Sequence, residues 1–187
     1  MKYGALALIG ACVLLLFVQC GAGSAGPARG GRGFNATDVM FLQMMVPHHD
    51  QGVRLARLAR RHDVRPEAAT LAAAIETTQL AELKTMAGRL RGWHRPPTAP
   101  AHTHAGHGGM PQTTEAELRT LEATPPARFE RAFLNLLIAH QDDAVQVARM
   151  EVRGGEDPWT RRLAESVARS RTAQITQMLT IVGPTRK

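Results

Sequence analysis

The residues best suited to chemistry lie in the run FLQMMVPHHDQGVRLA, residues 41–56, which joins methionines to histidines. The candidate ligands there are Met44, Met45, His48 and His49. Thioether and imidazole donors without cysteine suit Cu(I), whereas histidine alone also accepts Cu(II) or Zn(II). Methionine is also common core filler, so packing inside a helix is the alternative role for Met44 and Met45.

The pattern returns 92 residues later as FLNLLIAHQDDAVQVA, residues 133–148. His140 aligns with His48, and further along Met178 aligns with Met86. A repeat with apolar residues at helical spacing predicts two copies of a helical hairpin. Each aligned histidine shares a helix face with apolar residues, so we expect both to point inward and to approach each other.

The second helix of each hairpin carries further polar groups on one face. They are Gln79, Glu82 and Met86 in the first copy, and Arg171, Gln174 and Met178 in the second. A buried imidazole needs a partner for its nitrogens, and a metal ion is one candidate. The alternative is that His48 and His140 form hydrogen bonds with Glu82 and Gln174.

A second donor cluster lies between the hairpins, in the Pro-, Gly- and His-rich segment 95–112. It contains His102, His104, His107 and Met110. Such a composition cannot form a core and predicts a mobile linker, in which three close histidines can wrap an ion without a preformed site. Their spacing does not select the metal, and an incidental polar linker is the alternative.

The candidate donors of the two hairpins lie on four predicted long helices. The periodicity places these helices near 36–61, 66–92, 127–153 and 158–181. A shorter helix is predicted to start after Thr114 and to end before the third long helix. Asn35 and Asp157 are predicted N-caps. Two hairpins joined by a linker most economically form an all-α, up-and-down four-helix bundle.

The predicted organisation is a leader and tether at 1–25, a flexible glycine-rich segment at 26–34, and one bundle domain at 35–187. Within the domain, hairpin 35–94 and hairpin 114–187 flank the linker at 95–113. The leader combines Lys2 with an apolar run and then small residues, which is typical of an export signal. We therefore expect an extracytoplasmic protein.

Cys20 resembles the lipidated cysteine of a bacterial lipoprotein, although Gln19 replaces the small residue usual before it. Cleavage near Ser24 or Ala25, or retention as a short membrane anchor, are the alternatives. The other cysteine, Cys12, is also in the leader, so the exported domain has no thiol. Its soft-metal ligands must then be methionine or histidine.

The formal charge of +7 raises the question of nucleic-acid binding. The charges are scattered, however, and no aromatic residues interleave with them to stack on bases. A solvated basic surface is the better interpretation. The chain also lacks a Glu-x-x-His pair, a His-Glu-x-x-His motif, a Gly-x-Ser-x-Gly elbow and a glycine-rich phosphate loop, so no enzyme is predicted.

Three segments, DVMFLQMMVPHHDQGVRLA, IETTQLAELKTM and FERAFLNLLIAHQDDAVQVA, resemble the domain-of-unknown-function 305 (DUF305) family of exported bacterial proteins. The likeness covers about 35–182. It implies a ferritin-like four-helix fold, often tethered as a lipoprotein, that binds copper through histidine and methionine. The second hairpin departs from the family pattern: Gln141 replaces a second histidine, and Arg171 and Gln174 replace Gln and Glu. Fewer ligands and a nearby positive charge should weaken a central site.

The leading hypothesis is an exported copper-binding bundle, non-catalytic, that sequesters or passes on Cu(I) or Cu(II). The expected nitrogen donors are His48, His49 and His140, the sulfur donors are Met86 and Met178, and the linker histidines form a peripheral capture site. Expected partners are the metal ion and the membrane, and a homo-oligomer or a copper-transfer partner stays an open alternative. The competing hypothesis is a structural or interaction module of the cell envelope with a degenerate site.

Overall fold

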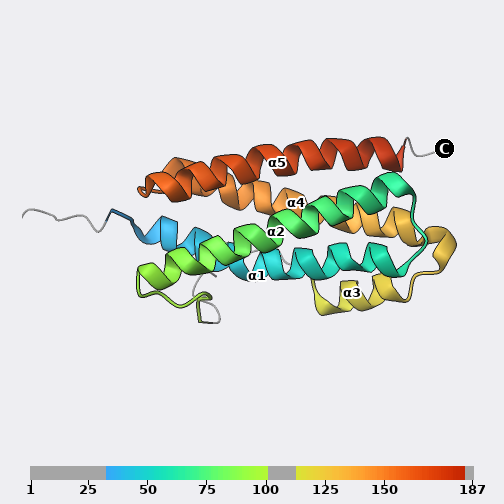
Figure 1. The fold of residues 1–187 in the computed structure, drawn as a ribbon, viewed down its shortest axis with the longest axis horizontal. Coiled ribbons are helices and arrows are strands. Elements are labelled where there is room, and N and C mark those ends of the chain that lie inside the picture. The colour runs from blue at the N-terminus through green and yellow to red at the C-terminus, as the bar shows by residue number, and fades with distance from the viewer. Residues whose placement is uncertain (1–32, 101–112, 184–187) are drawn as a thin grey trace, which may run out of the picture. The chain divides into compact units, whose positions relative to one another are not determined.

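The computed structural model describes residues 33–100 and 113–183. Within these stretches every regular element is a helix, and all of them belong to the compact unit Gly31–Lys187. The long helices are α1 (Ala36–Leu58), α2 (Pro66–Gly92), α4 (Pro126–Gly154) and α5 (Pro158–Val182), and the short ones are η1 (Ala59–Arg61) and α3 (Glu115–Glu122) (Figure 1). The predicted all-helical bundle is confirmed, and the predicted helix ends agree with the observed ones to within one residue once η1 is joined to α1.

The helix starts follow from local capping. The Asn35 side chain accepts hydrogen bonds from the backbone N–H groups of Thr37 and Asp38, while the Asp38 carboxylate accepts one from the Asn35 N–H at 2.6 Å. Thr114 and Glu117 form the same reciprocal box at the start of α3. Each bond satisfies an N–H group that the first helical turn leaves without a partner.

Contacts between helix ends define the topology. Asn35 donates a 2.7 Å hydrogen bond to the Gly154 carbonyl, which places the start of α1 beside the end of α4. At the opposite end, Arg65 contacts Glu130 near the start of α4 and the Ile181 carbonyl near the end of α5. Helices α2 and α4 therefore run in the same direction (Figure 1). The alternating up-and-down order predicted from the sequence therefore does not hold between α2 and α4, whereas a ferritin-like bundle does have one such long crossover between its hairpins.

The apolar core is divided into two clusters along the bundle. One cluster contains Leu55, Leu71, Phe133 and Met178, and the other contains Phe41, Met86, Ala148 and Val167. Along each long helix, a short polar stretch separates the residues of one cluster from those of the other. None of the described helices is long and apolar enough to cross a membrane.

Candidate metal centre

A buried polar layer crosses the middle of the bundle, between the two apolar clusters. All four long helices contribute to it: His48 and His49 from α1, Gln79 and Glu82 from α2, His140 and Gln141 from α4, and Arg171 and Gln174 from α5. Polar groups removed from water in this way are costly unless each finds a partner. The hydrogen bonds within the layer therefore show which donors are committed and which are available.

His48 and His140 form a stacked pair at the centre of the layer. Their ring centroids are 3.8 Å apart, and the planes are inclined by 11°. Both side chains are buried, and among the described residues neither nitrogen of His48 nor Nε2 of His140 has a hydrogen-bond partner. The sequence prediction that the two repeat-related histidines point inward and approach each other is confirmed.

Burial keeps this pair uncharged. Burial is the main cause that lowers the pKa of His48 well below its ordinary value, and the neighbouring His140, His49 and Arg171 lower it further; a contact with the His140 backbone, too poorly aligned to satisfy a ring nitrogen, opposes the shift least. The pKa of His140 falls to about 3 through burial and through repulsion by His49 and Arg171. Neutral imidazole is the form that binds metal ions, so both rings are in the correct protonation state at neutral pH.

Gly52 makes room for a third donor beside the histidine pair. A Cβ atom built on Gly52 would overlap Oε1 of Gln79 and would lie 2.6 Å from Nε2 of His140. Both atoms therefore approach the α1 backbone at this glycine, and in the described part of the chain neither has a hydrogen-bond partner. The other end of the Gln79 amide is fixed, because its Nε2 donates to Gln141 Oε1 at 3.2 Å.

The remaining nitrogen of His140 contacts the segment that leads into α3. Nδ1 lies 3.3 Å from the hydroxyl of Thr113, which is buried. Thr113 immediately precedes Thr114, the N-cap of α3. The docking of α3 is therefore linked to the orientation of the His140 ring.

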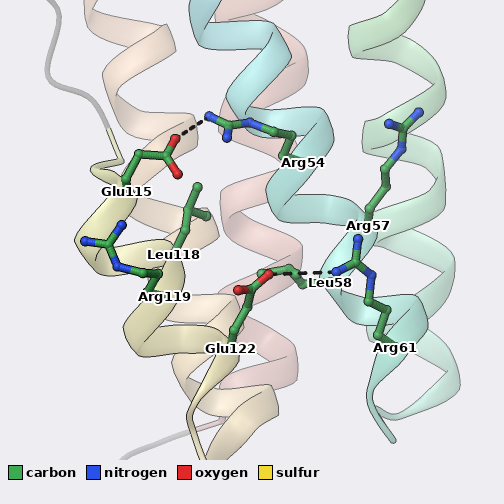
Figure 2. A pocket seen from close by; sticks show the side chains of 8 residues that line it. All are labelled: Arg54, Arg57, Leu58, Arg61, Glu115, Leu118, Arg119 and Glu122. Carbon is green, nitrogen blue, oxygen red and sulfur yellow. Dashed lines mark hydrogen bonds and ion pairs between the residues drawn. The ribbon is translucent and has the colours of Figure 1, made fainter.

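Figure 2 shows how α3 docks against the C-terminal half of α1 across a pocket of about 200 Å³. Leu118 of α3 and Leu58 of α1 line the pocket. Arg54 pairs with Glu115 at 2.8 Å, and Arg61 lies 3.8 Å from Glu122. Apolar contacts thus hold α3 on the bundle, with ion pairs at the rim.

His49 is committed to a different network from His48. Its Nε2 lies 2.7 Å from Oε2 of Glu82, and the guanidinium of Arg171 pairs with the same carboxylate oxygen. Burial opposes ionisation of Glu82, but the hydrogen bond from His49 and the charge of Arg171 outweigh it and lower the pKa of Glu82. Glu82 is thus an ionised carboxylate, and its charge is already paired with the guanidinium of Arg171.

The hydrogen-bonding alternative considered from the sequence assigned the wrong partners. Glu82 contacts His49 and Arg171 rather than His48, and Gln174 accepts a hydrogen bond from Gln141 rather than from His140. The two stacked imidazoles therefore retain nitrogens that no described residue satisfies.

The methionines divide between the two apolar clusters. Met44, Met45 and Met86 belong to one cluster, and Met40 and Met150 pack against it. Met178 belongs to the cluster on the other side of the polar layer, so the structure does not bring Met86 and Met178 into one group. The repeat explains this separation, since pseudo-symmetry places equivalent residues of the two hairpins on opposite sides of the layer.

Several predicted ligands lie outside the described residues: Cys20 and the linker residues His102, His104, His107 and Met110. Within the described part of the chain, no three His, Cys, Asp or Glu side chains are grouped closely enough to hold an ion. The donors of the layer that lack a hydrogen-bond partner among the described residues are instead ring nitrogens of His48, His49 (Nδ1) and His140, and the amide oxygen of Gln79. The sequence interpretation missed Thr113 and Gly52, although a glycine inside a helical pattern, one turn after His48, can mark a packing or functional role.

Fold and centre together define a class of protein: a bundle of two helical hairpins with a buried histidine pair in a polar layer between apolar clusters. The family model for the Domain of unknown function (DUF305) matches residues 38–182. This chain belongs to the DUF305 family. The resemblance identified in the sequence is confirmed.

Solved structures of the family share this fold. A DUF305 protein from Streptomyces coelicolor, described as a candidate secreted protein, is 27% identical over 78% of this chain and 91% of its own, with a TM-score of 0.72. A DUF305 fragment from Deinococcus radiodurans is 29% identical over 80% and 97%, with a TM-score of 0.69. CopM in its Cu(I)-bound form is 30% identical over 77% and 94%, with a TM-score of 0.63.

CopM has also been solved in Cu(II)-bound, Ag-bound and apo forms. A comparison with curated protein sequences found no significant match.

Proposed function

We propose that this protein binds copper ions as cargo in the cell envelope, either to sequester them or to pass them on, without catalysis. The observation that carries the proposal is the stacked pair His48–His140, which is buried and has three ring nitrogens without a hydrogen-bond partner among the described residues. Unpartnered buried nitrogens are costly, and a metal ion that binds one nitrogen of each ring would remove part of that cost.

The donor set suits copper. Imidazole binds Cu(I) and Cu(II), and thioether sulfur favours Cu(I). Met45 precedes His48 by three residues in α1, and Met86 follows Glu82 by four in α2, so each lies about one turn from the layer. His48 and His140 would supply the nitrogen donors, Gln79 an oxygen, and these methionines a sulfur.

The solved relatives support the same ligand. CopM, at 30% identity, has been crystallised with Cu(I) and Cu(II). Export is supported by the sequence of the leader and by the description of the Streptomyces coelicolor relative as a candidate secreted protein. Mass spectrometry of the mature N-terminus would decide between a lipid on Cys20, cleavage near Ser24, and a retained anchor.

Titration of residues 26–187 with Cu(I) against a competing chelator tests the central site. Two variants separate the candidate sites: one replaces His102, His104 and His107 by alanine, and the other replaces His48 and His140. We expect the tightest binding to survive the linker change and to disappear in His48→Ala plus His140→Ala, with helical content retained. Unchanged affinity in the double variant would remove the central site from the proposal.

A structural or interaction module is the second candidate, and one observation favours it. The chain Gln79–Gln141–Gln174 and the buried pair Glu82–Arg171 connect three long helices and fix their pairing without any ion. Thermal unfolding discriminates between the two functions, because a ligand that binds only the native state raises the melting temperature by mass action. A scaffold would show no such rise with Cu(I).

A further inference from the structure

Arg171 of α5 is an unusual residue of the polar layer, because its charged side chain is completely buried. Its side chain is 0% exposed, and by residue volume it is the largest of the fully buried side chains in the described part of the chain. A buried guanidinium is costly unless it is paired. Arg171 pairs with Glu82, and its Nη1 lies 3.3 Å from the Ser170 hydroxyl.

The internal repeat shows how unequal the two hairpins have become at this position. Arg171 is equivalent to Gln79, and Gln174 is equivalent to Glu82. The first hairpin therefore supplies a neutral amide and a carboxylate, whereas the second supplies a cation and a neutral amide. Glu82 and Arg171 consequently meet as opposite charges within one layer.

A single nitrogen of Arg171 contacts both members of the His49–Glu82 pair. Nη2 donates to Glu82 Oε2 and lies 3.4 Å from His49 Nε2, and these last two atoms are 2.7 Å apart, a hydrogen bond in which the imidazole N–H donates to the carboxylate. A carboxylate oxygen and an imidazole nitrogen at this separation can both bind one metal ion only if the imidazole N–H is lost. We propose that Arg171 occupies the cation position of this pair, so that this half of the layer holds an internal cation and binds no metal ion.

The inference deepens the proposed function and rests on it for the other half of the layer. There His48 and His140 keep nitrogens without partners, and Gln79 keeps a free amide oxygen among the described residues. Since a guanidinium is not deprotonated in proteins, the internal cation is permanent and does not depend on pH. Copper should therefore enter the bundle at His48–His140 and not at His49–Glu82.

The test restores the residue that the first hairpin has at this position. Arg171→Gln is made in residues 26–187 carrying alanine at His102, His104 and His107, and this chain contains every described helix. Both proteins are titrated with Ag(I), a redox-stable probe for a Cu(I) site. We expect Arg171→Gln to bind one more ion per chain than its parent, and His49→Ala in that background to remove the additional ion.

Two control variants separate local charge from total charge. Arg171→Lys keeps a cation in the layer, so it should bind no additional ion. Arg169→Gln removes the same charge from an exposed position two residues away, and it should also leave the number of bound ions unchanged. Circular dichroism checks that each variant keeps the helical content of its parent.

A second measurement tests whether His49 binds the ion without any substitution at Arg171. It therefore applies even if Arg171→Gln does not fold. Side-chain NMR of histidine is followed during Ag(I) titration of the parent protein. The signals of His48 and His140 should shift with the bound ion, while His49 keeps the signals of a ring bonded to Glu82. Direct coordination of Ag(I) by His49 with Arg171 in place would overturn the inference.

The outcomes also distinguish this inference from the proposed function. If the parent binds no ion in the bundle and Arg171→Gln binds one, the central copper site fails and the role of Arg171 stands. If the parent binds at His48–His140 and Arg171→Gln gains nothing, the copper site stands and the role of Arg171 is wrong.

Discussion

His48 and His140 stack with ring centroids 3.8 Å apart, although 92 positions separate them in the sequence. They are equivalent residues of the two hairpins, so they meet at the pseudo-twofold axis that relates the two copies. Burial holds both rings neutral, and the glycine at position 52 keeps space beside them. Four features of the bundle lead to predictions that can be checked separately.

Gly52→Ala should disturb the layer directly. Its Cβ would overlap the Gln79 amide and lie 2.6 Å from His140 Nε2, and both side chains are buried. We expect the free energy of unfolding, measured by urea denaturation, to fall by about 1–3 kcal/mol, the usual cost of overpacking. Copper affinity should fall as well, because Gln79 and His140 must move.

Gly88→Ala is the matched control, since it is also a glycine inside a helix. The nearest atom to its added Cβ is the tip of Arg91, at 3.8 Å. Here the better helix propensity of alanine should raise stability by about 0.5–1 kcal/mol. Similar effects at both positions would show that Gly52 is not required for close packing.

Glu82→Leu should be severely destabilising, because it leaves the buried Arg171 without its carboxylate. Breaking a buried pair from one side costs about 3–5 kcal/mol. Adding Arg171→Met should recover most of that loss, since two packed apolar residues can replace a buried ion pair. Chemical denaturation of the two single variants and the double variant measures the coupling, and additive losses would contradict it.

Glu151, buried in the last turn of α4, should make stability fall as the pH rises. Burial and the facing carboxyl groups of Asp38 and Asp157 raise the pKa of Glu151 to about 8. Between the ordinary glutamate pKa and this value, the native protein holds a proton that the unfolded chain has released, so unfolding becomes easier with increasing pH.

Glu151→Gln removes this proton dependence. We expect the variant to match the parent near pH 4.5 and to be more stable by about 1–3 kcal/mol near pH 8.5, because it buries no charge. Melting temperatures at the two pH values test the difference. Glu156→Gln, at an exposed neighbouring position, should leave the pH profile of the parent unchanged.

Helix α3 should depend on its leucines more than on its ion pairs. Leu121 is 3% exposed, whereas the side chains of the Arg54–Glu115 pair are 43% and 62% exposed. Leu121→Ala should cost about 2–4 kcal/mol, and Glu115→Gln less than about 1 kcal/mol. Hydrogen exchange of the α3 amides would show the same order, and a release of α3 by Glu115→Gln would reverse it.

The sequence by itself determined the helices, their limits and the two hairpins. Helix periodicity and capping are local properties, so Asn35, Thr114 and Asp157 could be identified as N-caps before the structure. The repeat also predicted that His48 and His140 would meet, because equivalent helices of two similar hairpins pack around one pseudo-symmetry axis.

Only the tertiary structure decided what each polar side chain contacts. Adjacent residues such as His48 and His49 point about 100° apart around a helix, so the rotation of α1 in the bundle determines which one faces α4 and which one faces α2. Packing turns His48 toward His140 and His49 toward Glu82, and it brings Arg171 onto the same carboxylate. It likewise places Met86 and Met178 in different clusters. Such pairings depend on helix rotations and distances between segments far apart in the chain, which residue spacing within a helix does not contain.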